Sequence, residues 1–265
     1  MPIDSYYTIH NYPISEEQRV KKLRIPPNWK DVKISTVFSD KIQVIGTDSK
    51  GRKQYIYHPL WVSFSTENKY SKINSLNFNK FIKIINKKSK ENILSKDYVI
   101  SNMLIIMKDL NIRVGNEIYL KENNSIGLCT MQKKNLKDNH FIFKGKRGVL
   151  HNKILSNKHI NFINKLILIP GKSIFKYSEN NQYYKILSTD LNQYLKKYIN
   201  ENMTCKDIRT YSANQIFIKK YKQLLKNEDP KAQINAIKYT ANEMGNTPKV
   251  CKDSYINPEL FKMEI

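Results

Sequence analysis

The side chains that most often carry metal or nucleophile chemistry are thinly spread in this sequence. Its three cysteines, Cys129, Cys205 and Cys251, lie far apart without a CxxC pair. This spacing favours neither a zinc site nor a disulfide framework, and it indicates a reducing, intracellular compartment. The histidines include no HxxxH pair, and the carboxylates do not cluster as two-metal nucleases require. If the protein acts on phosphodiesters, we therefore expect it to work without a metal.

Positive charge is the most pronounced property of the composition. The 265 residues include 46 Lys+Arg against 23 Asp+Glu, a formal net charge of +23. Such a field attracts polyanions, of which DNA is the densest common one, with RNA and anionic membrane surfaces as competitors. An AT-rich coding bias explains part of the Lys excess, but not where the arginines occur. No apolar run reaches the roughly 18 residues needed to span a bilayer, so we expect no membrane partner.

Six segments resemble the type IB DNA topoisomerases of poxviruses, other large DNA viruses and bacteria, and they occur in that family's order. They are IPPNWKDV at 25–32, GTDSKGRKQYIYHPLW at 46–61, RVGNEIYLKENNSIGLCTM at 113–131, FKGKRG at 143–148, KDIRTY at 206–211 and GNTPKVCKDSYINP at 245–258. The resemblance implies an enzyme that relaxes supercoiled duplex DNA as a monomer. It implies transient cleavage of one strand through a 3′-phosphotyrosyl intermediate, with neither ATP, metal nor another cofactor.

The resemblance also implies five catalytic residues. In chain order they are Arg113, Lys146, Arg209, Asn246 and Tyr255. Asn246 stands nine positions before Tyr255, where the poxvirus members usually have His. An Asn can donate a hydrogen bond to a phosphate oxygen, but it cannot carry the charge that a His can.

Phosphodiester chemistry explains why these residue types are needed. In-line attack makes a phosphorane with added negative charge, and two Arg side chains bind its non-bridging oxygens with paired donors that do not deprotonate. A Tyr has an ordinary pKa of about 10, so it needs a cationic neighbourhood to attack as phenolate. The departing 5′-oxygen needs a proton, which a Lys in a mobile hairpin can deliver and an Arg cannot.

Each of the five has a plainer interpretation. Tyr255 is one of 17 tyrosines, and Arg113 could serve as a helix cap or in a surface ion pair. Lys146 could be an ordinary turn residue, because lysines are common in hairpin turns. Arg209 could be a solvated helix charge, and Asn246, which follows a glycine, is typical of a helix C-terminus. The motif context favours the catalytic interpretation.

Five further residues are candidates for DNA binding. The resemblance implies that Gln54, Tyr55 and Tyr57 lie on a strand facing the major groove, where Gln reads adenine edges and Tyr contacts phosphates or thymine methyls. The alternative is a half-buried strand whose tyrosines pack on a neighbour. Tyr119 and Lys121 follow the RVGN segment, and we expect them to contact backbone phosphates.

The elements that must position these residues follow two periodicities. Short β-branched segments with prolines between them predict strands, and apolar residues at helical spacing predict helices. The segment 98–110 is the most apolar helix and is expected at the centre of the core. Strands are predicted at 31–37, 41–45, 53–57, 126–131, 140–144 and 149–154, and further helices at 158–169, 188–200, 208–225 and 231–244.

The predicted fold class is therefore α+β with two lobes. Residues 1–65 are expected to form an antiparallel β domain that binds DNA, and 66–75 a linker. Residues 76–265 are expected to form a mainly helical catalytic domain with a three-stranded sheet. The two lobes together would make a C-shaped clamp around duplex DNA.

Two other functions share some of these features. A tyrosine recombinase or integrase uses the same covalent chemistry, but it typically has HxxR at the second arginine, where this chain has KDIR at 206–209. A non-catalytic DNA-binding protein with a decayed site is the other, and the full set of catalytic residue types disfavours it. The AT-rich coding and the pox-like segments suggest a viral source, which would locate the protein in the virion and at a cytoplasmic or nuclear replication site; the similarity to bacterial members leaves a bacterial source open.

Overall fold

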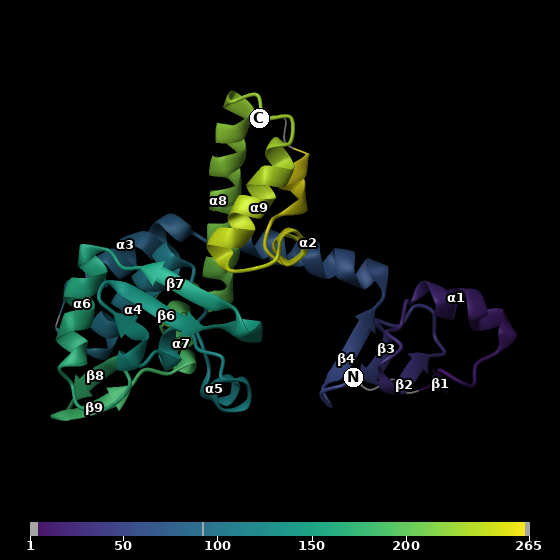
Figure 1. Ribbon diagram of the computed structural model, residues 1–265, viewed down its shortest axis with the longest axis horizontal. Helices are drawn as coiled ribbons and strands as arrows, with labels where there is room; N and C mark the ends of the chain where they lie inside the picture. Colours follow the sequence, from purple (N-terminus) through teal and green to yellow (C-terminus); the bar gives the residue numbers. More distant parts are fainter. Residues whose placement is uncertain (1–4, 92, 263–265) are drawn as a thin grey trace. The chain divides into compact units, whose positions relative to one another are not determined.

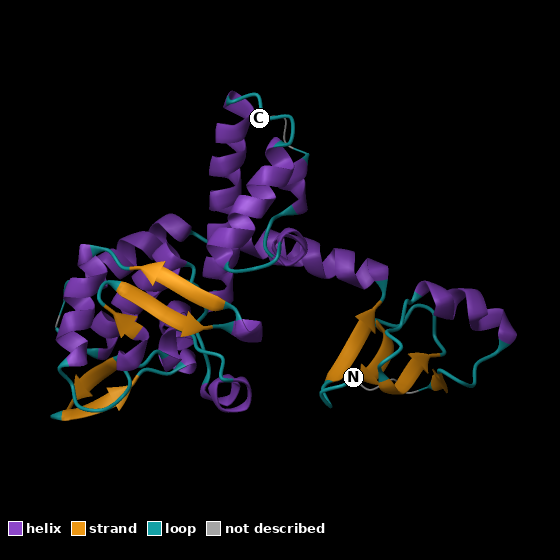
Figure 2. Ribbon diagram, in the orientation of Figure 1, coloured by secondary structure: helices purple, strands orange, loops and turns teal. Residues whose placement is uncertain are grey.

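The computed structural model describes residues 5–91 and 93–262, and the chain divides into two compact units. The first unit extends to Lys72 and the second begins at Ile73. Both helices and antiparallel sheets are present, as Figures 1 and 2 show, and the α+β fold class is confirmed. None of the described helices is long and apolar enough to cross a membrane.

The first unit is built on a four-stranded antiparallel sheet with the strand order β1-β2-β3-β4. The strands are β1 (Tyr6–Thr8), β2 (Lys30–Ser35), β3 (Ile42–Thr47) and β4 (Lys53–Tyr57). Three of them match the predicted strands. Helix α1 (Glu17–Lys22) contributes Val20 to a small core with Val32, Ile34 and Val44. Neither β1 nor α1 was predicted, because each is too short to show a period.

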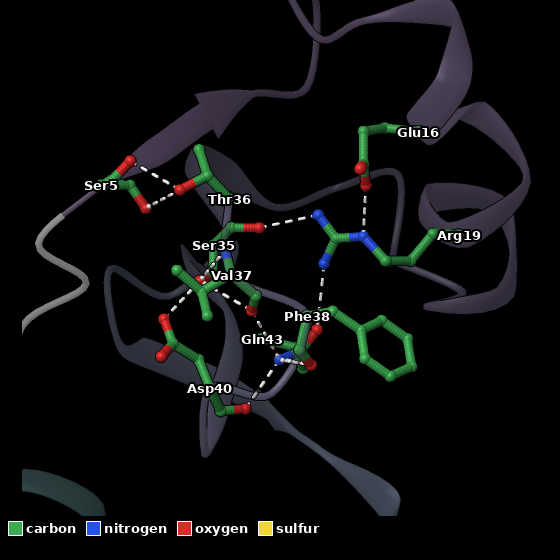
Figure 3. Close-up of polar contacts among 9 residues, drawn as sticks. All are labelled: Ser5, Glu16, Arg19, Ser35, Thr36, Val37, Phe38, Asp40 and Gln43. Carbon is green, nitrogen blue, oxygen red and sulfur yellow. Dashed lines mark hydrogen bonds and ion pairs between the residues drawn. The ribbon is translucent and has the colours of Figure 1, made fainter.

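A buried polar network fixes the loop between β2 and β3 (Figure 3). Arg19 donates from Nη1 to Oε1 of Gln43 at 3.0 Å and from Nη2 to the carbonyl of Ser35 at 2.7 Å. The Gln43 amide in turn donates to the carbonyls of Phe38 and Asp40, at 3.0 and 2.6 Å. Arg19 is therefore occupied inside the unit, and its charge serves the loop rather than a partner.

Helix α2 (Pro59–Ser75) includes the stretch that was predicted to be a linker. That stretch, 66–75, is polar and shows no apolar period. It is helical, with Tyr70 and Ile73 buried. The apolar residues in the first turns of the helix, Leu60, Trp61, Val62 and Phe64, are spread around it. The helix therefore lacks the apolar stripe by which a sequence pattern reveals a helix.

The second unit is mainly helical, with α4 (Lys96–Leu110) at its centre, as predicted. Every residue of α4 from Tyr98 to Met107 is buried. The Ser95 side chain caps its first turn by accepting from the amide of Tyr98 at 3.2 Å, and Asn111 ends it in the left-handed conformation. Around it lie α3 (Phe78–Lys88), α6 (Asn157–Ile167) and α7 (Ser188–Tyr198), whereas the short helix α5 (Glu117–Asn123) has no buried residue.

Three further helices form a second hydrophobic cluster in the same unit. They are α8 (Cys205–Lys226), α9 (Ala232–Met244) and α10 (Pro248–Ser254). Phe217 of α8 and Met244 of α9 are buried there, together with Cys251 of α10. This packing brings the end of α10, where Tyr255 lies, against the helix that carries Arg209.

The three-stranded sheet of the second unit has the order β5-β6-β7, and one of its strands differs from the prediction. The strands are β5 (Leu136–Lys137), β6 (His140–Lys144) and β7 (Leu150–Ile154). The segment 126–131 was expected as the third strand, but residues Leu128–Thr130 form a 3-10 turn. The amides of Leu128 and Cys129 donate to the carbonyls of Arg113 and Val114 in the segment after α4, and the Ile126 amide donates to Lys144 of β6. A separate hairpin, β8 (Lys176–Glu179) with β9 (Gln182–Lys185), was not predicted.

Candidate active site

An open pocket of about 950 Å³ lies in the second unit between the β6–β7 turn, the segment after α4 and the ends of α9 and α10. Four of the five predicted catalytic residues line it: Arg113, Lys146, Asn246 and Tyr255. The fifth, Arg209, is buried at 4% exposure and lies close to Tyr255. Residues up to 142 positions apart in the sequence therefore meet in one place.

Close backbone packing holds Arg113 in place just after the end of α4. The amide of Leu128 donates to the carbonyl of Arg113 at 2.8 Å. A side chain at Gly127 would meet that carbonyl at 2.7 Å, and Gly115, with a φ of +78°, faces Gly127. Only residues without a Cβ allow this approach. The RVGN segment and the 3-10 turn that replaces the predicted strand thus form one rigid support for the guanidinium.

Asn246 is oriented by that guanidinium. Arg113 donates from Nη2 to Oδ1 of Asn246 at 2.6 Å. This bond uses the amide oxygen of Asn246 and leaves Nδ2 as its free donor. Nδ2 is buried without a hydrogen-bond partner. Asn246 follows Gly245, which ends α9 with a φ of +61°. The helix-end interpretation is therefore correct for the backbone, while the side chain faces the pocket.

Arg209 carries two more unpartnered donors. Its Nη2 donates to the carbonyl of Met244 at 3.1 Å, but its buried Nε and Nη1 have no partner. Together with Asn246 Nδ2 they are the only buried side-chain donors without an acceptor among the described residues. Buried polar atoms are nearly always hydrogen-bonded. Three such donors beside one pocket indicate a site for an anion.

Tyr255 is half-buried at the end of α10, with the Arg209 guanidinium 5.5 Å from its ring centroid. Burial raises the pKa of Tyr255, but the nearby charges of Arg209 and Arg113 outweigh it, so the pKa lies below the usual 10. Burial and the charge of Arg113 lower the pKa of Arg209 to about 10, which leaves it cationic at neutral pH. The site favours a phenolate.

Asn214, which was not predicted from the sequence, fixes the chain around Tyr255. Its Nδ2 donates to the carbonyl of Tyr255 at 2.9 Å, and its Oδ1 accepts from the amide of Asn257 at 2.8 Å. It lies on α8, which also carries Arg209. The only sequence signal for such a role is an Asn in the interior of a long predicted helix.

Lys146 lies in the turn that joins β6 to β7. The turn is closed by a bond from the amide of Gly148 to the carbonyl of Gly145 at 3.1 Å, and Arg147 within it has a φ of 63°. Lys146 is exposed and lines the pocket, whereas Lys144, two residues earlier, is exposed and lies outside the pocket lining.

Two basic residues of β7 also line the pocket and were not singled out from the sequence. Lys153 donates to the carbonyl of Glu243 at 2.8 Å, and its burial lowers its pKa. His151 is 9% exposed. Burial first, and then the charges of Lys153, Arg113 and Arg209, lower the pKa of His151 to about 4, so its ring is neutral.

Of the candidate DNA-binding residues, three lie on β4 and two on α5. Tyr55 and Tyr57 are exposed and stacked on one face of β4, with ring centroids 6.2 Å apart. Gln54 lies on the opposite face by strand alternation, and its amide donates to Asp48 at 3.0 Å. The strand therefore does not present Gln54 beside the tyrosines.

On α5, Tyr119 and Lys121 are exposed and lie outside the pocket lining.

The three cysteines are all free thiols and all buried. Among the described residues no group of three or more His, Cys, Asp or Glu side chains is placed to hold a metal ion.

Comparisons with known proteins match nearly the whole chain. Residues 53–254 match the model of the family described as eukaryotic DNA topoisomerase I, catalytic core, and residues 5–48 match the bacterial DNA topoisomerase IB, N-terminal domain. The first range contains four of the five candidate catalytic residues and ends next to Tyr255.

Three viral proteins illustrate the similarity to whole sequences. DNA topoisomerase 1B of Acanthamoeba polyphaga mimivirus is 32% identical over 97% of this chain and 85% of its own length. DNA topoisomerase 1 of rabbit fibroma virus is 27% identical over 89% of this chain and 78% of its own length. DNA topoisomerase 1B of vaccinia virus strain Copenhagen is 26% identical, over 97% and 86% respectively.

Proposed function

The chain belongs to the type IB DNA topoisomerases, and from that premise we propose that Tyr255 cleaves one strand of duplex DNA and that the pocket around it reseals the strand. The observation that carries the proposal is the set of buried donors without acceptors on Arg209 and Asn246, next to a tyrosine of lowered pKa. A phosphodiester supplies the missing acceptors, because its non-bridging oxygens each accept hydrogen bonds.

Each residue has a distinct part in the proposed reaction. The Tyr255 phenolate oxygen attacks the phosphorus, and the bond from phosphorus to the 5′-oxygen breaks. Arg113, Arg209 and Asn246 donate to the non-bridging oxygens, where negative charge grows. Lys146 gives its proton to the departing 5′-oxygen, which would otherwise leave as an unstable alkoxide.

The product is a 3′-phosphotyrosyl strand with a free 5′-hydroxyl. The phosphodiester bond energy is retained in the tyrosyl ester, so the hydroxyl reseals the strand by the reverse step without ATP. Supercoils relax while the nick is open. The proton returns to Lys146, and Tyr255 leaves as phenolate beside the two guanidinium groups.

DNA binding in this proposal combines charge with a tyrosine face. The stacked Tyr55 and Tyr57 supply an exposed contact surface on β4, while Gln54 would first have to leave Asp48. Tyr119 and Lys121 extend the contacts to backbone phosphates. Duplex binding by a monomer of net charge +23 is expected to weaken steeply with salt, because each neutralised phosphate releases counterions.

The test is a plasmid relaxation assay in EDTA without ATP. We expect the wild-type protein to relax both positive and negative supercoils and to form an adduct with DNA that survives SDS. Tyr255→Phe should bind DNA but form no adduct, and Tyr239→Phe, another tyrosine of the second unit, is the matched control. Strict dependence on magnesium, or an adduct with Tyr255→Phe, would contradict the proposal. Recombination of two duplexes without relaxation would instead favour a tyrosine recombinase.

A further inference from the structure

The imidazole ring of His151 lies between the backbones that carry two of the proposed catalytic residues. A Cβ on Gly145 would meet Cδ2 and Nε2 of the ring at 2.7 Å. A Cβ on Gly245 would overlap Cε1 and meet Nδ1 at 3.0 Å. The ring therefore touches both glycines so closely that neither position has room for a side chain.

These glycines immediately precede Lys146 and Asn246. Gly145 begins the β6–β7 turn and Gly245 ends α9, so the two positions are 100 residues apart in the chain. The ring fills the space between them and sets how closely the turn approaches the helix end. The distance between the general acid and the phosphate-binding amide then depends on the width of one ring, whose opposite edges meet the two glycines.

The ring is itself held in place. It stacks on Phe143 with ring centroids 4.9 Å apart and an interplanar angle of 20°. His151 and Phe143 form a cross-strand pair between β6 and β7. No hydrogen bond to a ring nitrogen is present among the described residues, so packing rather than hydrogen bonding fixes the ring.

The surroundings of His151 suit an uncharged spacer. Lys153, Arg113 and Arg209 are the charged groups that act on it, and all three are positive. A further positive charge on the ring would oppose the buried guanidinium of Arg209. A neutral ring at pH 7 fills the space at no electrostatic cost.

We propose that His151 is a positioning residue for strand cleavage, whose ring holds the Lys146 turn at a fixed distance from Asn246. The proposal rests on the proposed function, since it concerns the geometry of that reaction. It assigns the effect to the shape of the ring and not to a proton or a hydrogen bond of its nitrogens.

Three substitutions separate shape from hydrogen bonding. His151→Ala removes the ring, His151→Asn keeps a polar side chain without a ring, and His151→Phe keeps a flat ring without nitrogens. In single-turnover cleavage we expect the two variants without a ring to lose on the order of 10- to 100-fold, as a misplaced catalytic group does. His151→Phe, whose six-membered ring is wider than the imidazole, should lose less than either of them. Circular dichroism and thermal unfolding establish that each variant is folded.

A substrate with a bridging 5′-sulfur tests whether the loss acts through Lys146. The thiolate leaves without a proton, so cleavage of this strand does not need the general acid. The sulfur substrate should restore most of the rate lost in His151→Ala. A rate order with Asn above Phe, a wild-type rate in His151→Ala, or a loss that sulfur does not restore would each overturn the proposal.

A double substitution tests the contact itself. Gly145 has an extended backbone that any residue adopts, so Gly145→Ala should slow cleavage only because its methyl meets the ring. In a His151→Ala background the same change should cost nothing further, and an additive loss would contradict the contact. If the wild-type protein forms no covalent adduct at all, the proposed function fails and this inference with it. If only the His151 variants behave otherwise than expected, the inference alone fails.

Discussion

Replacing Arg209 with methionine should make the free protein more stable while it abolishes strand cleavage. The guanidinium is 4% exposed, and its Nε and Nη1 lack partners. Its pKa of about 10, against an ordinary 12.5, corresponds to about 3 kcal/mol at 1.36 kcal/mol per unit. Because this pKa is lowered, the folded state holds the proton less tightly than the unfolded state, and the cost is fully present below pH 10.

The net gain is smaller than the cost that is removed. Arg209→Met also loses the hydrogen bond to the Met244 carbonyl, worth about 1 kcal/mol. A net stabilisation of about 2 kcal/mol remains, which corresponds to a rise in Tm of roughly 4–8 °C for a domain of this size. Cleavage should fall by 100-fold or more, because the transition state loses its paired donors.

Thermal unfolding monitored by circular dichroism, together with single-turnover cleavage, measures both effects. Lys206→Met is the matched control for stability, since it removes an exposed positive charge from the same helix, and its Tm should change little. A fall in the Tm of Arg209→Met would refute the reasoning. An equal rise in the Tm of Lys206→Met would assign the gain to net charge alone.

Three further predictions follow from the geometry of the pocket. Asn246→Ala should slow cleavage by about tenfold or more because Nδ2 no longer donates, whereas Asn246→His should be tolerated; equal, wild-type rates in both would leave Asn246 as a helix end only. Lys146→Ala should cleave an ordinary strand slowly and a 5′-sulfur strand at nearly the wild-type rate, with Lys144→Ala as the unaffected control; failure of the sulfur to restore the rate would remove the general-acid role. On the sulfur strand, the wild-type rate should rise with pH as Tyr255 ionises and should level off below pH 10, because the pKa of Tyr255 is lowered. Arg113→Ala should move that plateau to higher pH. An unchanged profile would mean that the Arg113 charge does not act on the phenolate.

Elements with a strong period could be predicted from the sequence. The continuous apolar run in α4 and the alternating strands around the Lys146 turn allow only one interpretation, and both form as predicted. The β8–β9 hairpin also carried a signal. Asn180 and Asn181, both with positive φ, form the two-residue turn that Asn favours, between strands that contain Tyr177, Tyr183 and Tyr184.

The missed parts of the site depend on contacts between distant segments. His151 looks like an ordinary strand residue until Gly245 approaches its ring, and Asn214 looks like a polar helix residue until the chain after Tyr255 folds back onto it. The segment 126–131 has the composition of a strand, but its backbone bonds the Arg113 segment. A local pattern records none of these partners.

The three buried thiols can report local opening of the protein. Burial raises the pKa of Cys129 to about 12 and that of Cys251 to about 11, and it raises the pKa of Cys205 further still. An alkylating reagent should therefore leave the native protein unmodified and label a cysteine only when the surrounding core opens. Cys251 belongs to the cluster of α8, α9 and α10, and the other two to the core around α4. Their labelling rates, followed separately by peptide mass, would report whether the helices that hold Tyr255 open independently of the rest of the unit.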